Sequence, residues 1–447
     1  MRYLPNTPQN QRAMLDVIGA RAIEDLLVKI PAKARLSRPL GLPPALAETD
    51  LIHLLRGLAA ENADADSYTC FAGGGAYDHY VPSPINHLIS RGEFFTAYTP
   101  YQPEASQGTL RTIYEYQTMI AELTGMDVAN ASIYDGGSAL AEAVLMARDI
   151  TGRHEVVMTA GVHPLSRRVV ETYGQGLGLQ LRTAPLGDGI TDADGLRKAV
   201  SSKTAAIVVQ SPNLFGCLEE IADAAAVAHE AGALLIASVD PVNLGVLEAP
   251  GAQGVDICVG EGQGLGVPLG FGGPNLGVLA VKKDFIRRIP GRLAGATVDL
   301  DGHRGFVLTL QAREQHIRRE KATSNICTNV ALCALMGTIY MSIMGKAGLV
   351  RVGELSTAKA HHAAGVLAAV PGVRLRFGAP FFKEFTLALP KPPERVARRL
   401  LKDRILAGVP LARFDRKLRD CLVVAVTERR TRAEIDAFAA ALAKAVA

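Results

Sequence analysis

Apolar residues near the start of the chain recur at the spacing of an α-helix. Between Gln9 and Val28 they stand on one face of such a helix, and Pro31 ends the run. The pattern predicts a helix over this stretch and a second one from Glu48 to Leu58. The Pro-rich connector 31–44 between them indicates an N-terminal arm, residues 1–70, rather than a separate domain. Arms of this kind often wrap a partner subunit.

From Phe71 onward, strand-like and helix-like patterns alternate. Short apolar runs bounded by Gly, Pro or Asp predict strands, at 155–159, 205–210, 234–239, 256–259 and 276–281. Helical periods predict helices between them, at 110–124, 138–151, 164–173 and 222–231. The alternation predicts an α/β domain over residues 71–330, with a mainly parallel sheet covered on both faces. Ligands of such sheets bind beyond the carboxyl ends of the strands, so the residues after each run are site candidates.

The last third of the chain has a different pattern. A long helical stretch at about 329–369 is followed by strand-like runs at 373–377, 384–389 and 421–426, with helices at 393–407 and 432–446. This mixture predicts a small C-terminal α+β domain, residues 331–447. We place the boundary between the two domains near residue 330.

Composition narrows the class of protein. Of 447 residues, 48% are hydrophobic and 21% charged, which is typical of a globular chain with a buried core. The net charge is only +4 and the basic residues are scattered, so nucleic-acid binding is not expected. No stretch approaches the roughly 20 apolar residues of a membrane span. Six cysteines without a CxxC pair indicate reduced thiols, no metal site and a cytoplasmic protein.

Asp240 follows the predicted strand 234–239 directly. A carboxylate at a buried strand end needs a cationic partner, and in pyridoxal-phosphate (PLP) enzymes that partner is the protonated pyridine nitrogen. An aspartate that caps the turn after the strand is the other interpretation, and position alone does not separate the two.

A Gly-rich stretch follows, from Asp256 to Pro274. A dinucleotide-binding fingerprint must open a helix, but Pro268 and Pro274 interrupt this stretch and an apolar run comes next. The pattern favours a strand, a loop and a return strand, the unit that carries the Schiff-base lysine in fold-type-I PLP enzymes. No lysine occurs from Thr204 to Val281, and Gln263 or a near neighbour occupies the expected position. An amide side chain forms hydrogen bonds but no imine, so the chain cannot perform covalent PLP chemistry alone.

Two lysines stand just beyond this unit. Lys282 and Lys283 follow the return strand beside Asp284, and we interpret them as solvated charges.

Several motifs resemble the P-protein family of the glycine cleavage system, and in particular the alpha subunit of its two-subunit form. The motifs are RYLPNT (2–7), FAGGGAYDHYVP (71–82), AYTPYQPEASQGTL (97–110), YEYQTM (114–119), ANASIYDGGS (129–138) and REQHIRREKATSNICT (313–328). They cover most of residues 1–330, whereas the C-terminal domain is weakly diagnostic. Chance does not explain a string as long as YTPYQPE.

The resemblance implies a fold-type-I PLP-transferase-like protein that pairs with a homologous beta subunit as an α2β2 heterotetramer. The beta subunit would hold PLP covalently through its lysine. The pair would act as glycine dehydrogenase (aminomethyl-transferring, decarboxylating): it would decarboxylate glycine, release CO2 and pass the aminomethyl group to the lipoyl arm of H-protein.

The resemblance also assigns candidate site residues. Thr323, Ser324 and Asn325 would lie near the phosphate of the beta subunit's PLP, with Arg313, His316 and Arg318 adding charge. Ordinary interface hydrogen bonds are the alternative for this segment. Tyr98, Thr99, Tyr101 and Gln102 would line the substrate or lipoyl entrance, unless they form only a packed turn. Ser138 begins a predicted helix whose N-terminus suits a phosphate, and with Asp240 it would mark a vestigial pocket.

Two other functions stay open at this point. A stand-alone PLP aminotransferase or decarboxylase would use a lysine outside the expected position. A non-catalytic scaffold or regulatory paralogue would keep only the fold.

Overall fold

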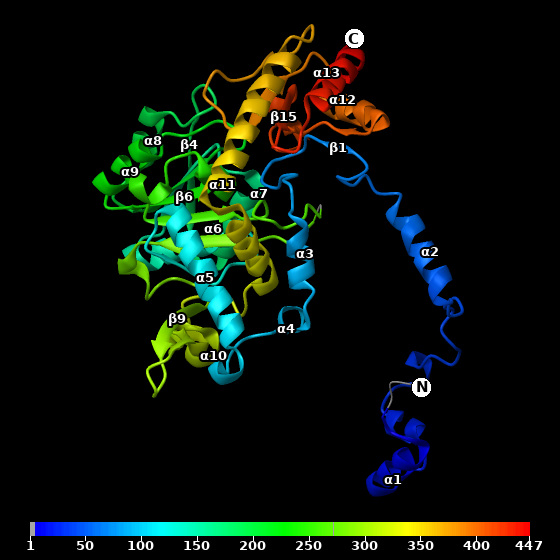
Figure 1. Cartoon of the computed structure of the whole chain (residues 1–447). Coiled ribbons are helices and arrows are strands. Elements are labelled where there is room, and N and C mark those ends of the chain that lie inside the picture. Colours follow the sequence, from blue (N-terminus) through cyan, green and yellow to red (C-terminus); the bar gives the residue numbers. More distant parts are fainter. Residues whose placement is uncertain (1–4, 271) are drawn as a thin grey trace. The chain divides into compact units, whose positions relative to one another are not determined.

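The computed structural model describes residues 5–270 and 272–447. Arg2, Tyr3 and Leu4 of the RYLPNT motif, and Phe271 of the Gly-rich stretch, lie outside the described residues. The chain divides into two compact units, Met1–Asn62 and Ala63–Ala447, which are drawn together in Figure 1.

The first unit contains two α-helices, α1 (Pro8–Ile18) and α2 (Glu48–Ala59). The prediction of one helix from Gln9 to Val28 was wrong in its length. α1 ends because Gly19 takes a left-handed conformation (φ 80°) and its N–H caps the carbonyl of Asp16. A short 3-10 helix, Ile23–Leu27, follows the break. The second predicted helix is confirmed by α2.

The second unit is built on a seven-stranded sheet with the order β2-β8-β7-β6-β5-β3-β4. β3, β4, β5, β6 and β7 are parallel, and β8 and β2 join antiparallel at one edge. The strands are β2 (Val128–Ala129), β3 (Glu155–Thr159), β4 (Gln180–Ala184), β5 (Thr204–Ser211), β6 (Leu234–Val239), β7 (Ile257–Glu261) and β8 (Gly277–Val281). The mainly parallel sheet is confirmed, and so is the strand, loop and return strand formed by β7 and β8.

Helices cover both faces of this sheet. They are α5 (Gln107–Thr124), α6 (Gly136–Thr151), α7 (Pro164–Gly174), α8 (Ala193–Ala199), α9 (Ile221–Glu230) and the long α11 (Ala331–Ala368). Successive strand residues point to opposite faces. Val157 and Leu235 pack in the core that contains α5, α8, α9 and α11, whereas Val156 and Ile236 pack with α6 and α7.

Shorter elements extend the sheet domain. A β-hairpin formed by β9 (Leu293–Val298) and β10 (Arg304–Thr309) packs against α5, and the sequence analysis did not predict it. The short helices are α3 (Ser83–Ile89), α4 (Gly92–Phe95) and α10 (Gln315–Arg318).

A second, antiparallel sheet occupies the C-terminal part, in the order β11-β12-β15-β14. Its strands are β11 (Arg374–Leu375), β12 (Glu384–Ala388), β14 (Val409–Pro410) and β15 (Cys421–Ala425), with helices α12 (Pro393–Leu400) and α13 (Arg432–Val446) beside it. The predicted helix at 393–407 was wrong beyond Leu400. There, β13 (Ile405–Leu406) pairs instead with β1 (Thr69–Cys70), because that pairing completes the backbone hydrogen bonds of both segments.

α11 joins the two sheets. Its first half contributes Met336 and Tyr340 to the core on one face of the large sheet, and its last turns place Ala363 and Leu367 in the core of the small one. Gly345 (φ 58°) interrupts the helix between them. The division of the chain near residues 70 and 330 stays a prediction.

α11 is also the helix, among those described, that is long and apolar enough to cross a membrane. The expectation that no stretch reaches that length and apolarity was wrong for this helix. Half of its most apolar window is buried inside the protein, as in the core helix of a globular domain.

Gly277 provides a test of the packing between β8 and the start of α6. A Cβ at this position would lie 2.5 Å from the carbonyl oxygen of Asp135. We expect Gly277→Ala to lower the free energy of unfolding by about 2 kcal/mol, because the backbone has to shift to admit the methyl group. Urea denaturation followed by circular dichroism measures the change.

Gly365→Ala is the matched control, because its Cβ would meet nothing within 4 Å on α11. Alanine in a helix interior should leave stability unchanged or raise it by up to about 1 kcal/mol. Equal stabilities for the two variants would contradict the tight packing at Gly277.

Candidate functional site

A cavity of about 320 Å³ lies beyond the carboxyl ends of the parallel strands. Segments that follow β3, β5, β6 and β7 form its wall, together with the start of α6 and residues 74–77. This is where the topology of an open α/β sheet places a ligand. The polar side chains that line it include Tyr77, Asp135, His163, Gln210, Asp240 and Glu261.

Asp240 stands directly after β6 and lines this cavity. Its Oδ1 accepts a hydrogen bond from the Val242 N–H at 3.0 Å, which caps the short helix Pro241–Gly245. Its Oδ2 lies 2.5 Å from Nζ of Lys383. The carboxylate is therefore a turn cap and also has a cationic partner, which comes from the same chain.

Lys383 connects Asp240 to a buried histidine. The Lys383 side chain is only 1% exposed, and its Nζ lies 2.8 Å from Nε2 of His79. Because an ammonium group only donates, Nε2 accepts, and His79 carries its proton on Nδ1. That nitrogen lies 2.6 Å from a carboxylate oxygen of Glu428. A continuous row of polar contacts thus runs from Asp240 through Lys383 and His79 to Glu428.

The environment of Glu428 favours its ionised form. Burial opposes the charge, but the hydrogen bond from His79 and the Tyr80 N–H outweigh it and hold the pKa at about 2. A neighbouring carboxyl, Glu384, behaves in the opposite way. Burial raises its pKa to about 6, despite hydrogen bonds from the Tyr77 hydroxyl and the Gly74 N–H.

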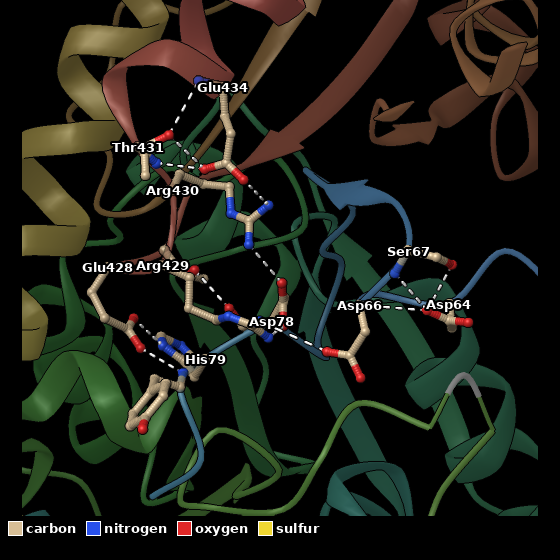
Figure 2. Close-up of polar contacts among 12 residues, drawn as sticks. Asp64, Asp66, Ser67, Asp78, His79, Glu428, Arg429, Arg430, Thr431 and Glu434 are labelled. Atoms are coloured by element: carbon tan, nitrogen blue, oxygen red, sulfur yellow. Dashed lines mark hydrogen bonds and ion pairs between the residues drawn. The ribbon is translucent and has the colours of Figure 1, made fainter. Parts of the chain in front are cut away.

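The segment 69–80, which we call the strap, holds these groups in place. β1 pairs with β13, and the ring of Phe71 lies 4.6 Å from that of Phe438 in the C-terminal core. The carboxylate of Asp78 contacts both Arg429 and Arg430, with Arg430 Nη2 at 2.9 Å. Figure 2 shows Asp78 and His79 facing the run Glu428–Arg430. The segment overlaps the motif FAGGGAYDHYVP (71–82), for which the sequence suggested no role.

Two carboxylates occupy the N-terminus of α6. Asp135 Oδ1 accepts from the Ser138 N–H at 2.6 Å, and Glu261 Oε2 accepts from the Gly136 N–H at 2.9 Å. Glu261 Oε1 accepts from two further backbone N–H groups, those of Gln263 and Leu276, while burial raises its pKa. The helix start that the sequence suggested for a phosphate, at Ser138, thus already has anionic partners.

Gln263 is a connector between two segments. Its amide oxygen accepts from the Tyr77 N–H at 2.8 Å, and its amide nitrogen donates to the Val267 carbonyl at 2.7 Å. The side chain is 3% exposed and is not among the residues that line the cavity. Both ends of the amide are therefore used inside the protein.

His163 lines the cavity wall after β3, and sequence analysis missed it. Its Nδ1 accepts from the Leu165 N–H at 3.1 Å, which leaves the proton on Nε2. Burial, with a smaller effect of Arg413, lowers the pKa of this imidazole to about 4. A histidine after a predicted strand was the signal that could have found it.

PLP does not fit this cavity. No lysine is among its described lining residues, so no imine forms there. The pyridine nitrogen would compete with Lys383 for Asp240, and the phosphate would meet the carboxylates of Asp135 and Glu261 at the helix start. The cavity therefore lies where this fold binds a ligand, but its lining residues do not suit PLP.

Lys282 also differs from its predicted role. Its Nζ lies 2.5 Å from Asp256 Oδ1, and the side chain is only 38% exposed. It is a half-buried ion-pair partner rather than a solvated charge, because the return strand carries it over the buried start of β7. Lys283 is exposed, as predicted.

A second cavity, of about 470 Å³, has a strongly cationic wall. Its lining includes Arg287, Arg288, Arg313, Arg318 and Lys321. Its one carboxylate, Asp149, already pairs with Arg148 at 2.7 Å. None of the five cations forms an ion pair within the part of the chain that the structure describes.

Arg313 anchors this wall. Its guanidinium donates to the carbonyls of Leu310 and Gly291 at 3.1 and 2.9 Å and also contacts the carbonyl of Ile289. These neutral acceptors fix its position but leave its charge uncompensated.

The three residues suggested for a cofactor phosphate lie at or beside this cavity. Thr323 lines it, and its N–H donates to the Arg313 carbonyl at 3.1 Å. Ser324 Oγ accepts from the Ile326 N–H at 3.0 Å, and Asn325 is exposed. Thr323 thus lies with Arg313 and Arg318, whereas Asp240 lines the cavity at the strand ends. Ser138 follows the lining residue Gly137 but does not itself line that cavity.

The loop 98–102 exposes its two tyrosines, while Pro100 between them is buried. Tyr98 is 83% exposed and Tyr101 is 53% exposed. The guanidinium of Arg292 lies 5.6 Å from the ring centre of Tyr101 and donates to the carbonyl of Cys327 at 2.7 Å. This arginine therefore connects the loop to the end of the 313–328 motif.

The same loop also has turn contacts of its own. The Thr99 carbonyl accepts from the Tyr101 N–H at 2.9 Å, and the Gln102 carbonyl accepts from Ala105. The loop therefore combines a packed turn with exposed aromatic rings.

Comparison with known proteins gives one consistent result. The family model described as glycine cleavage system P-protein matches residues 1–442. A relative from Geotalea uraniireducens, named probable glycine dehydrogenase (decarboxylating) subunit 1, is 52% identical over 98% of both chains. A relative with the same name from Chloroherpeton thalassium is also 52% identical, over 99% of both chains.

Solved structures agree. A crystal structure of glycine decarboxylase (P-protein) of the glycine cleavage system, in inhibitor-bound form, is 48% identical, with a TM-score of 0.91 over the full length of both chains. The sphingosine-1-phosphate lyase of Burkholderia pseudomallei, only 16% identical, shares the fold with a TM-score of 0.67.

Glu428 offers a test of the buried row of charges. Its folded pKa of about 2 lies below the ordinary 4.5, so it stabilises the fold above pH 4.5 and loses that effect as the pH falls toward 2. The difference corresponds to about 3 kcal/mol. We expect Glu428→Gln to remove this stabilisation at pH 7 and to flatten the dependence of unfolding free energy on pH below 4.5.

Glu354→Gln is the control, since Glu354 forms an exposed pair with Arg351 at 3.2 Å. Urea titrations of wild type and both variants between pH 3 and 7 measure the effect. A Glu428 variant as stable as wild type at pH 7 would show that His79 and Glu428 are not coupled.

Proposed function

The chain belongs to the glycine cleavage system P-protein family as an alpha subunit, and on that basis we propose that it works with a homologous beta subunit that carries the Schiff-base lysine. The assembled enzyme, an α2β2 heterotetramer, decarboxylates glycine, releases CO2 and passes the aminomethyl group to the lipoyl arm of H-protein. PLP, held covalently by the beta subunit, supplies the electron sink for this chemistry. We place the enzyme in the cytoplasm, in keeping with six free cysteines.

One observation supports the proposal that the imine-forming lysine belongs to the partner subunit. We assign the position of the reactive amine to Gln263, whose amide oxygen and nitrogen each have a backbone partner, at Tyr77 and Val267. An amide cannot form an imine, and Asp240 already has an internal cation. The reactive amine therefore has to come from a second polypeptide. The names of the full-length relatives, each a subunit 1, support a partner subunit.

The cationic cavity is the part of this chain that we assign to the partner's cofactor. A phosphate prefers charge-assisted hydrogen bonds from arginine and hydroxyl donors. Thr323 supplies a hydroxyl at the cavity wall, and Arg313 and Arg318 supply charge without a carboxylate partner among the described residues. Ser324 and Asn325 continue the same segment. This arrangement supports a site for the phosphate of the beta subunit's PLP.

The loop of Tyr98, Thr99, Tyr101 and Gln102 is our candidate for the substrate or lipoyl entrance. Two exposed aromatic rings offer an apolar surface with polar edges, which suits a small amino acid or a dithiolane-bearing arm. Arg292 connects this loop to the segment that ends in Thr328, so the entrance and the phosphate segment lie on connected elements.

The N-terminal arm supports a partner as well. Neither α1 nor α2 buries a residue. Large apolar side chains of the arm that stand at least 40% exposed include Met14, Val17, Ile18, Val28, Leu40, Leu42, Leu51, Leu55 and Leu58. Apolar surface of this extent marks a protein interface.

Reconstitution tests the proposed function. The chain is mixed with a lysine-bearing homologous subunit, lipoylated H-protein and PLP, and glycine-dependent exchange of labelled CO2 is measured. We expect exchange from the mixture and only background from either subunit alone, because neither has a complete site. An aldimine absorbance band from this chain alone would favour a stand-alone PLP enzyme. A mixture no faster than the beta subunit by itself would favour a scaffold.

The cationic cavity has its own test in the assembled enzyme. We expect Arg318→Ala with Lys321→Ala to weaken PLP affinity roughly tenfold, since one charge-assisted contact contributes about 1.4 kcal/mol. Fluorescence titration of the apo-enzyme with PLP measures the dissociation constant. Arg395→Ala with Lys402→Ala, two exposed cations near α12, is the control with the same change of charge. Unchanged PLP affinity in the first variant would contradict the assignment.

A further inference from the structure

Lys383 is a buried cation to which the proposed function gives no role in the reaction. It stands just before β12 of the small sheet, and its ammonium group reaches Asp240 at the end of β6 in the large sheet. Of the two side chains, Lys383 is 1% exposed and Asp240 is 11% exposed. A lysine is almost never this deeply buried unless its charge is paired.

Two further contacts surround the ammonium group. His79 Nε2 lies 2.8 Å from it and accepts a hydrogen bond. The ring centre of Tyr77 lies 3.7 Å away, so the cation also rests on an aromatic face. The backbone N–H of the same Tyr77 donates to Gln263. Lys383 thus stands where β6, the strap and β12 meet.

Charge balance explains why a cation is needed here. Asp240 and the buried Glu384 both lie close to Tyr77 and would be uncompensated without it. Removing one member of a buried ion pair is strongly destabilising, because the other charge loses both water and its partner. Lys383 meets this need within the chain.

We propose that Lys383 is a resident cation that takes the place beside Asp240 that a cofactor's pyridinium would take. Its contacts with Asp240, His79 and Tyr77 form a permanent structural connection, or joint, between the large sheet, the strap and the small sheet. The cavity at the strand ends therefore does not take a phosphorylated pyridine, whichever state the partner is in. Lys383 is not among the residues that line this cavity, so it is a positioning residue and not an imine-forming one.

A double-mutant cycle on the full chain tests the joint. We expect Lys383→Met to lower the Tm by roughly 5 °C or more, and Lys383→Met with Asp240→Asn to recover at least half of that loss. Lys282→Met is the matched control: its pair with Asp256 has the same 2.5 Å separation, but the lysine is 38% exposed. That variant should change the Tm much less. A Lys383→Met variant as stable as wild type, or losses that simply add, would overturn the proposal.

Chemical rescue distinguishes a missing charge from a missing side-chain volume. In Lys383→Ala, millimolar n-propylammonium should raise the Tm, because the amine restores the cation beside Asp240. The same concentration of n-propanol should have no such effect, and neither should the amine in Lys383→Ala with Asp240→Asn. Equal effects of amine and alcohol would show that Lys383 only fills space and would overturn the proposal.

PLP content of the assembled enzyme separates this proposal from the proposed function. We expect Asp240→Asn in this subunit to leave the PLP bound per α–β pair unchanged. Halved PLP content would mean that Asp240 binds a cofactor and would overturn the resident-cation assignment. The stability measurements need no partner and no activity. If reconstitution failed, the proposed function would fall while the Lys383 assignment would still be decided by the Tm values.

Discussion

The constraint on which the structure depends is that a charge removed from water needs a partner. At the end of β6 and β7, the chain meets this requirement by itself. Asp240 pairs with Lys383, and Glu261 accepts backbone N–H groups of Gly136, Gln263 and Leu276. Because these partners come from distant parts of the sequence, satisfying the charges also fixes how the sheets and the strap pack together.

This self-sufficiency supports our proposal that the subunit keeps the fold of a PLP enzyme while its partner holds the cofactor. The large sheet, its helices and the strand-end cavity follow from apolar burial, which does not depend on the chemistry of the site. The site itself is changed at a few positions. An amide stands at Gln263, an internal cation stands beside Asp240, and carboxylates stand at the start of α6. Each change removes one interaction that a bound PLP would need.

Around the motif 313–328, in contrast, arginine and lysine side chains lack carboxylate partners within the described part of the chain. The five cations of the second cavity have no carboxylate partner among the described residues, and Arg292 is buried against neutral groups only. Uncompensated cations close to the surface attract an anion from outside. The two regions therefore contrast. The carboxylates at the strand-end cavity have partners within the chain, whereas the cations of the second cavity need an anion from a bound molecule. This contrast is why we assign the second region to the partner's site.

The sequence by itself determined the class of fold. Apolar runs with period two or 3.6 predicted β3, β5, β6, β7 and β8 and the helices between them, because these patterns reflect local geometry and burial. Motifs such as YTPYQPE indicated the family. The absence of lysine from 204 to 281 indicated that the chain cannot form an imine with PLP in this segment. Short or paired elements were missed where the outcome depends on a distant partner. β13 pairs with β1 across more than 300 residues, and no local pattern announces it.

The candidate site divides in the same way. The sequence alone showed that Asp240 follows a strand. It also showed that Gln263, as an amide, cannot form an imine. It could not show the partner of Asp240, because Lys383 approaches it from a segment 143 residues further along the chain. The sequence also could not show that Thr323 shares a cavity with Arg287. Local pattern determines which elements form, but only tertiary packing decides which charges meet, because distance in space is independent of distance along the chain.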